Sequence, residues 1–162
     1  MKTVRKIVVL WLLCFTIQIQ LIQGCRSGWI QHGDSCYLLS KDAESWGDAS
    51  IICITLLSRL AAVESADENN FLKAEAQRLH AQGYWIDGTD VEVENVWRWT
   101  ASGDKISYLN WGGQEPNAGE SGNCLALWRD FGYQWADESC HAARNFICEM
   151  RADVDANYQV VG

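Results

Sequence analysis

The chain contains a single proline, Pro116, and the residues on either side of it, Glu115 and Asn117, both carry side-chain oxygens. Proline fixes its own φ and makes a cis peptide bond before it accessible, at about 0.5–1 kcal/mol above the trans form. A cis turn would direct Glu115 and Asn117 toward one point, and Ca²⁺ prefers oxygen ligands of this kind. The segment is therefore a candidate calcium site, with a polar surface turn as the alternative reading.

Residue patterns typical of catalysis are missing. The chain has three histidines, His32, His80 and His141, and contains neither a Gly-x-Ser-x-Gly elbow nor the paired histidines of a metal-hydrolase helix. The sequence therefore favours a binding protein over an enzyme.

The N-terminal segment is typical of a secretory signal. A short basic start precedes an apolar run over residues 7–22, and Gly24 is a small residue suited to a cleavage point. We expect residues 1–24 to be a signal peptide and the mature chain to be secreted, with an uncleaved anchor as the alternative. Loss of this segment changes the formal net charge from −8 to −11, because it carries three basic residues and no acid. Such a charge argues against nucleic acid and anionic membranes as partners, and no later apolar stretch is long enough to span a bilayer.

Six of the seven cysteines remain once Cys14 leaves with the signal. Disulfides are the default in an oxidising compartment, and six cysteines allow fifteen pairings. No Cys-x-x-Cys pair occurs, which argues against a zinc site. The six cysteines are Cys25, Cys36, Cys53, Cys124, Cys140 and Cys148.

Two stretches of the sequence predict helices. Apolar residues recur at three- and four-residue steps over residues 43–57, which indicates a helix with one buried face. Ser65 and Glu68 form a capping box at the start of a second helix, which we expect to end near His80. The remaining chain predicts short aromatic-rich strands over residues 37–39, 60–63, 84–86, 96–99, 124–128, 133–135 and 145–148.

A long segment between Trp99 and Cys124 has little regular patterning, and loops of this length inside a compact domain are usually functional. We expect one domain over residues 25–150 and a short C-terminal tail over residues 151–162.

Ordered motifs run through the whole of this domain: Gly28-Trp29, Cys36-Tyr37, Trp46 with Ala49 and Cys53, Leu60-Ala61-Ala62-Val63, Trp85-Ile86-Asp87-Gly88, Trp97-Arg98-Trp99, Glu115-Pro116-Asn117, Trp135-Ala136-Asp137 and Phe146-Ile147-Cys148-Glu149. In this order and with this cysteine spacing, the chain resembles the C-type lectin-like family. It looks most like short secreted invertebrate lectins, including perlucin-like shell-matrix proteins. The resemblance implies an α+β fold with two helices, short antiparallel sheets and a long ligand-binding loop. It also implies the disulfides Cys25–Cys36, Cys53–Cys148 and Cys124–Cys140.

The same resemblance implies the ligand set. In mannose-type members, a Glu-Pro-Asn triplet with a cis proline supplies two Ca²⁺ ligands that also hydrogen-bond sugar hydroxyls. Carried over to this chain, these ligands are Glu115 and Asn117, with Pro116 as the structural cis proline. Asp137 and Glu120 are the further ligands to the ion and to the carbohydrate that the resemblance implies.

Two departures from the family pattern bear on this site. Ala136 stands where the family usually has Asn, so one amide ligand is missing. Gly122 stands where the family has an acid, and Glu120 is its nearest substitute. Asp90 and Glu94 match ligands of the family's auxiliary Ca²⁺ site, with a solvated acidic loop as the alternative.

Two functions follow from the resemblance. The first is calcium-dependent recognition of mannose-type glycans on microbial or self surfaces, in innate immunity; the intact Glu115-Pro116-Asn117 triplet favours it. The second is an interaction or biomineral-matrix protein with a degraded sugar site, which Ala136 favours. A homo-oligomer would raise the avidity of a weak site.

Overall fold

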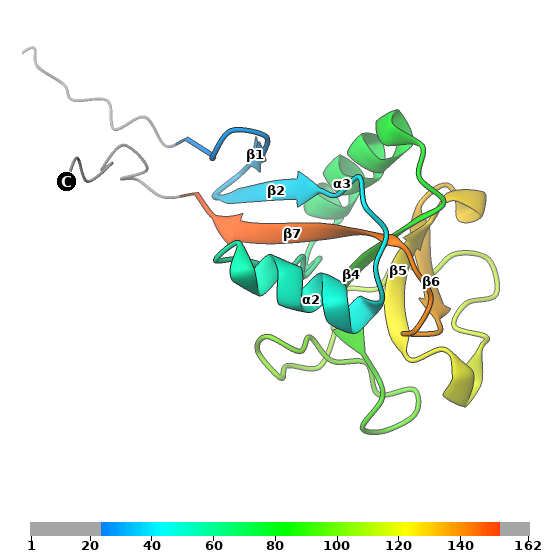
Figure 1. Cartoon of the computed structure of the whole chain (residues 1–162). Coiled ribbons are helices and arrows are strands. Elements are labelled where there is room, and N and C mark those ends of the chain that lie inside the picture. The colour runs from blue at the N-terminus through cyan, green and yellow to red at the C-terminus, as the bar shows by residue number, and fades with distance from the viewer. Residues whose placement is uncertain (1–23, 153–162) are drawn as a thin grey trace, which may run out of the picture. The chain divides into compact units, whose positions relative to one another are not determined.

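The computed structural model describes residues 24–152, which form two helices and seven strands (Figure 1). The helices are α2 (Trp46–Thr55) and α3 (Ala66–Leu79). The strands are β1 (Ile30–His32), β2 (Ser35–Leu39), β3 (Arg59–Leu60), β4 (Gly83–Thr89), β5 (Cys124–Trp128), β6 (Gln134–Glu138) and β7 (Asn145–Arg151). Two 3₁₀ turns, η1 (Gly119–Ser121) and η2 (Arg129–Phe131), lie on either side of β5.

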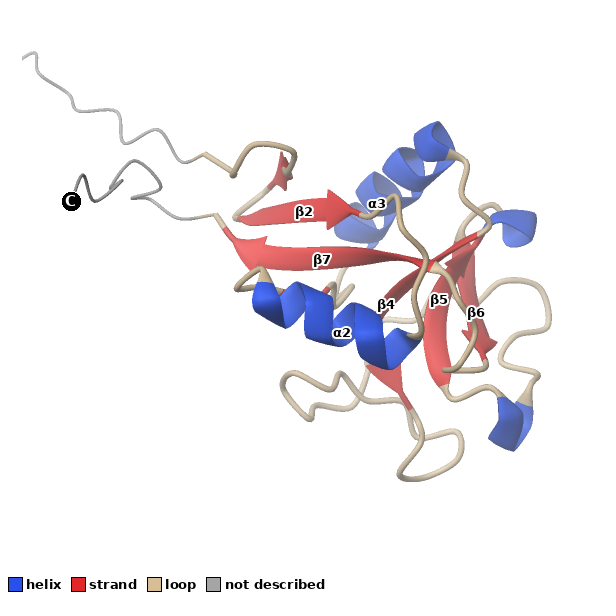
Figure 2. Ribbon diagram, in the orientation of Figure 1, coloured by secondary structure: helices blue, strands red, loops and turns tan. Residues whose placement is uncertain are grey.

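The strands form one sheet in the order β1-β2-β7-β4-β5-β6, and β3 also pairs with β7. Strand β7 therefore lies at the centre of the sheet, and α2 runs beside it (Figure 2). The predicted α+β class is confirmed, but the pairing is not purely antiparallel, because β4 and β7 are parallel, with Trp85 opposite Phe146. Local patterning locates strands and does not give the direction in which distant strands pair.

Both helices begin at a serine. Ser45 accepts a hydrogen bond from the backbone N–H of Asp48 (3.2 Å), so α2 starts at Trp46, three residues later than expected. Ser65 caps α3 in the same way, accepting from the N–H of Glu68 (3.2 Å). The carboxylate of Glu68 reaches back toward the cap as the capping box predicts, but it accepts from the N–H of Glu64 (2.9 Å), one residue before the N-cap Ser65.

The aromatic segment expected as a strand over residues 96–99 is not one. Arg98 forms only isolated bridges with Thr89 and Lys105, while Trp97 and Trp99 are buried. Trp97 and Trp99 lie edge-on to Trp111 and Trp135, respectively, with ring centroids 5.1 and 6.0 Å apart. The aromatic spacing of this segment therefore reflects the core rather than a sheet.

Three disulfides join Cys25 to Cys36, Cys53 to Cys148 and Cys124 to Cys140. These are the pairs that the resemblance implies. Cys124–Cys140 joins the start of β5 to the segment that follows β6, close to the candidate site.

Residues 90–123 form a long loop between β4 and β5. Its first half is anchored by Asp87, which is 1% exposed and accepts hydrogen bonds from the backbone N–H groups of Thr100 (3.1 Å) and Ala101 (3.2 Å) and from the Thr100 hydroxyl. This buried carboxylate belongs to the Trp85-Ile86-Asp87-Gly88 motif, so Asp87 has a structural role there.

The folded part of the chain extends two residues beyond the expected boundary at residue 150. Strand β7 continues to Arg151, and the N–H of the buried Ala152 donates to the carbonyl of Asp34 (2.7 Å). Neither helix within residues 24–152 has the length and apolar character needed to cross a bilayer. The signal peptide expected at the N-terminus and the tail expected at the C-terminus fall mainly on residues 1–23 and 153–162, outside the described residues, and stay predictions.

Candidate functional site

The Glu115–Pro116–Asn117 segment lies in the second half of the long loop, and the Glu115–Pro116 peptide bond is cis. The Asn117 side-chain amide donates a hydrogen bond to Glu115 Oε1 (2.8 Å), so the two side chains on either side of the proline point toward each other. The N–H of Glu115 donates to the carbonyl of Gly112 (2.8 Å), which holds the start of this turn. The sequence placed these two side chains together, and the structure has them in contact.

Asp137 on β6 completes the arrangement. Its Oδ1 accepts from the N–H of Asn117 (2.9 Å), and its Oδ2 accepts from the N–H of Ala118 (2.8 Å). Asp137 itself is 6% exposed, and both hydrogen bonds are partly buried. The loop and the strand thereby bring Glu115, Asn117 and Asp137 to one place, although Asp137 lies twenty residues beyond Asn117 in sequence.

These three residues line a shallow cavity of about 330 Å³. Its other lining residues are Ala118, Ser121, Trp128, Phe131, Ala136, Glu138 and Ser139. The Phe131 ring packs against Gly112, where an added Cβ would lie 2.6 Å from the Phe131 Cβ, so only glycine fits there. Sequence reasoning singled out neither Phe131 nor Trp128 for this site, because nothing local in the sequence distinguishes them from core aromatics.

The electrostatics favour a cation. Burial, followed by the neighbouring Asp137 carboxylate, raises the pKa of Glu115 to about 7. Two carboxylates held near each other with limited access to water repel, and a bound cation relieves that repulsion. The oxygens available from Glu115, Asn117 and Asp137 are the hard donors that Ca²⁺ prefers, so the donor set fits this ion. It is a small set for an ion that takes about six to eight oxygens, because Ala136, which is 2% exposed and lines the cavity, adds none.

Glu120 is not brought to this cavity. It lies exposed on η1, and its carbonyl accepts from the Asn123 side-chain amide (3.1 Å). Its charge acts instead on Glu94, whose pKa is raised first by desolvation and then by the charges of Asp90, Glu120 and Asp137. Gly122 cannot be replaced by the family's acid in this backbone, because a Cβ there would lie 2.4 Å from the Ala118 Cβ.

The candidate auxiliary residues are close but do not form a ligand cluster. Asp90 is 4% exposed; its Oδ2 accepts from the N–H of Asn95 (2.8 Å), and its Oδ1 is a buried oxygen without a hydrogen-bond partner in the described chain. Within residues 24–152, however, no three His, Cys, Asp or Glu side chains are grouped so that they could hold a metal ion. The site at Glu115 is not such a group of three either, because it has two carboxylates and its third member is the amide Asn117.

The fold and this site define a class of protein, and comparison of the chain with known protein families identifies that class. The Lectin C-type domain family matches residues 42–150, and the chain belongs to this family. Its members are non-enzymatic carbohydrate-binding domains that generally bind calcium, so the expectation of a binding protein rather than an enzyme is confirmed.

Among known proteins, the chain is similar to perlucin of Haliotis laevigata, with 39% identity over 129 residues that cover 78% of this chain and 83% of perlucin. It is also similar to a perlucin-like protein of Mytilus galloprovincialis, with 30% identity over 128 residues, or 77% and 82% of the two chains.

The fold is also similar to those of solved structures. The carbohydrate-recognition domain of the mouse scavenger receptor C-type lectin superposes with a TM-score of 0.74 at 30% identity, covering 80% of this chain and all of that domain. A complex of SPL-1 with GlcNAc gives 0.70 at 32% identity, covering 78% and 94% of the two chains. A calcium-independent type II antifreeze protein gives 0.73 at 28% identity, covering 80% and 96%.

Proposed function

We propose that this protein is a secreted, calcium-dependent lectin that recognises mannose-type glycans through Glu115, Asn117 and Asp137. The observation that carries the proposal is the convergence of these three side chains at one open cavity, where burial and then the neighbouring Asp137 carboxylate raise the pKa of Glu115. The expected signal peptide supports secretion.

The proposed residues have distinct tasks. Glu115, Asn117 and Asp137 would hold Ca²⁺, and the bound ion would supply the charge that attracts two neighbouring sugar hydroxyls. The Glu115 carboxylate is an acceptor, and the Asn117 amide beside it is a donor, 2.8 Å away. A sugar hydroxyl can donate to the first while accepting from the second. Asp137 positions the pair by binding the loop backbone.

The acceptor–donor order of the triplet supports mannose-type sugars, a class that also includes N-acetylglucosamine. The similar protein SPL-1 is in complex with GlcNAc, which supports this class. Because Ala136 adds no ligand and Glu120 lies outside the cavity, we expect weak calcium binding, with a dissociation constant of about 10⁻³ M. Glycans on microbial surfaces present many copies of a sugar, and a homo-oligomer would convert weak single sites into useful avidity. Innate recognition of such surfaces is the proposed role.

A second candidate function is an interaction or biomineral-matrix protein that keeps this fold without sugar recognition. Ala136 favours it, because the missing amide weakens the site. The similarity to perlucin, and to an antifreeze protein described as calcium-independent, also supports it.

The test is retention of the mature chain on immobilised mannose, first with Ca²⁺ and then with a chelator. We expect retention with Ca²⁺ and release by the chelator, and loss of retention in the Glu115→Ala variant. Flow-through of the wild-type chain in both conditions would overturn the lectin proposal and favour the matrix function. Retention of Glu115→Ala equal to wild type would overturn the assignment of the site.

A further inference from the structure

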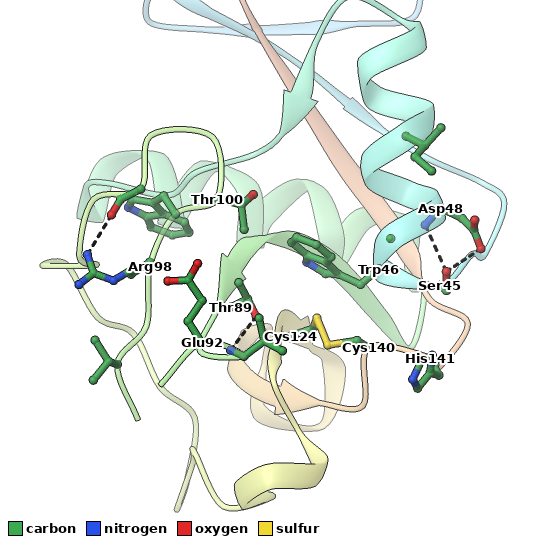
Figure 3. Close-up of a pocket in the computed structure, with 16 residues that line it drawn as sticks. Ser45, Trp46, Asp48, Thr89, Glu92, Arg98, Thr100, Cys124, Cys140 and His141 are labelled. Carbon is green, nitrogen blue, oxygen red and sulfur yellow. Dashed lines mark hydrogen bonds between the residues drawn. A yellow bond between two sulfur atoms is a disulfide. The ribbon is translucent and has the colours of Figure 1, made fainter. Parts of the chain in front are cut away.

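A second and larger cavity, of about 860 Å³, lies between the N-terminal half of α2 and the first half of the long loop (Figure 3). It shares no lining residue with the cavity at Glu115. Its size falls within the range of small-molecule sites in proteins, about 300–1,000 Å³. Nothing in the proposed lectin function uses it.

The walls of this cavity are fixed. The indole N–H of Trp46 donates to the carbonyl of Ile86 (3.0 Å), which holds the ring of the first α2 residue against β4. On the loop side, Thr89 and Arg98 exchange two backbone hydrogen bonds of 3.0 and 2.9 Å. The Cys124–Cys140 disulfide also lines the cavity. A site held in this way needs little ordering when a ligand enters, which favours binding.

The surface of the cavity is mostly apolar. Trp46, Val96 and the disulfide line it, together with Ile51 from α2 and Val91 from the loop. Ile51 is 60% exposed and Val91 is 67% exposed, so each keeps a large apolar side chain in water. A ligand with an apolar body would cover both side chains, and removing that surface from water favours binding.

The charged groups around the cavity favour a cationic ligand. The Glu92 carboxylate extends into the space between the loop and α2 (Figure 3), and it forms no ion pair with any residue in the described part of the chain. The other acid, Asp48, accepts from the hydroxyl of Ser45 (2.6 Å) at the start of α2. The Arg98 guanidinium donates to the carbonyl of Gly103 (2.9 Å) and is drawn toward that turn. His141 is the remaining titratable lining residue.

We propose that this cavity is a second binding site, which takes small amphipathic amines with an aromatic or branched aliphatic body and one cationic nitrogen. The apolar body contacts Trp46, Ile51 and Val91, and the nitrogen faces Glu92. The site is separate from the lectin site and does not require calcium.

The test compares two probes that share an indole ring and differ in charge: tryptamine, which is cationic, and indole-3-propionate, which is anionic. Binding is measured by ligand-detected saturation-transfer NMR and by calorimetry, at low ionic strength and with a chelator present. We expect tryptamine to bind about fivefold more tightly than indole-3-propionate, the ratio for one exposed ion pair at the upper end of its usual strength, because Glu92 is exposed. Glu92→Gln should remove this preference. Equal binding of the two probes by the wild-type chain would overturn the proposed ligand class.

Two further variants test whether tryptamine binds in this cavity. An added Cβ at Gly47, which lines the cavity, meets no atom within 4 Å, so the side chain of Gly47→Leu starts in open space and places a bulky apolar group at the cavity. Leucine also has a higher helix propensity than glycine, so the thermal midpoint should not fall. We expect Gly47→Leu to abolish tryptamine binding and Ile51→Ser to weaken it. Ile54→Ser is the matched control, because Ile54 is 61% exposed on the same helix and lies outside the cavity. Undiminished binding in Gly47→Leu, or equal losses in the two serine variants, would overturn the site.

Discussion

The backbone N–H of Asn117 donates a hydrogen bond of 2.9 Å to Oδ1 of Asp137, and this bond ties the Glu115–Pro116–Asn117 segment to β6. The second oxygen of the same carboxylate accepts from the N–H of Ala118 at 2.8 Å. One buried side chain therefore shapes the loop and also faces the candidate site. Because the loop depends on Asp137 and not on Glu115, the two acids should respond differently to substitution.

Asp137→Ala should both destabilise the fold and abolish calcium-dependent sugar retention. It leaves the partly buried N–H groups of Asn117 and Ala118 without their acceptors. A fully buried unsatisfied donor costs about 1–3 kcal/mol, so we expect a loss near the low end, about 1 kcal/mol. Glu115→Ala is the comparison, since the Glu115 side chain accepts only from the exposed Asn117 amide and its removal relieves the repulsion with Asp137, so its thermal midpoint should not fall below that of wild type. Calorimetric melting of both variants, with the mannose column run in parallel, separates the two roles. Equal midpoints for Asp137→Ala and wild type would contradict the anchoring role.

Ala136→Asn should tighten calcium binding. Ala136 lines the same cavity as Glu115 and Asp137, so a longer side chain there adds an amide oxygen to a small ligand set. The measurement is a calcium titration by calorimetry, and we expect about a tenfold gain for one added ligand, or about 1.4 kcal/mol. Ala136→Val is the matched control, because it adds bulk without an oxygen. A gain in both variants, or in neither, would show that the missing amide is not what limits the site.

The elements that the sequence predicts well are those defined by neighbouring residues. The start of α3 follows from Ser65 and Glu68, which contact each other across one helical turn. Helix α2 starts three residues later than the periodicity predicts, because Glu44 pairs with Arg144 through two backbone hydrogen bonds of 2.9 and 3.0 Å. Glu44 therefore pairs with a residue one hundred positions away in sequence and does not join the helix. Hydrophobic periodicity cannot reveal such a distant partner.

The candidate site also has one part that follows from neighbouring residues and another that depends on distant contacts. Glu115 and Asn117 are adjacent to one proline, so their contact follows from the local sequence. The placement of Glu120 does not, because it depends on how closely Gly122 packs against Ala118. The anchoring of the loop by Asp87 was also missed, since it depends on three hydrogen bonds to residues 100 and 101 that only the folded chain brings together.

Removing the Cys124–Cys140 disulfide should damage both stability and sugar binding. The bridge spans 16 residues and encloses β5 and β6, and β6 carries Asp137. Cys25–Cys36, which spans 11 residues around β1, is the matched control, because loop-closure entropy assigns about 3 kcal/mol to either bridge. Paired Cys→Ser variants of the two bridges should therefore lose similar stability, while only the first loses retention on mannose at a temperature where both remain folded. Equal retention in the two variants would contradict a role for this bridge in the site.

Glu68 should make the stability of the fold depend on pH. Desolvation raises the pKa of its carboxyl above 4.5, although the hydrogen bond from the Tyr37 hydroxyl (2.7 Å) opposes the shift. The folded state therefore holds this proton more tightly than the unfolded state, and its contribution to the free energy of unfolding falls as pH rises from 4.5 through the raised pKa. Glu68→Gln removes this titration and can still accept from Tyr37. Its stability relative to wild type should rise as pH increases from 4 to 7, measured by denaturant unfolding at each pH. Tyr37→Phe removes the opposing hydrogen bond and should steepen the wild-type trend, whereas a stability difference between Glu68→Gln and wild type that is constant with pH would contradict the shift.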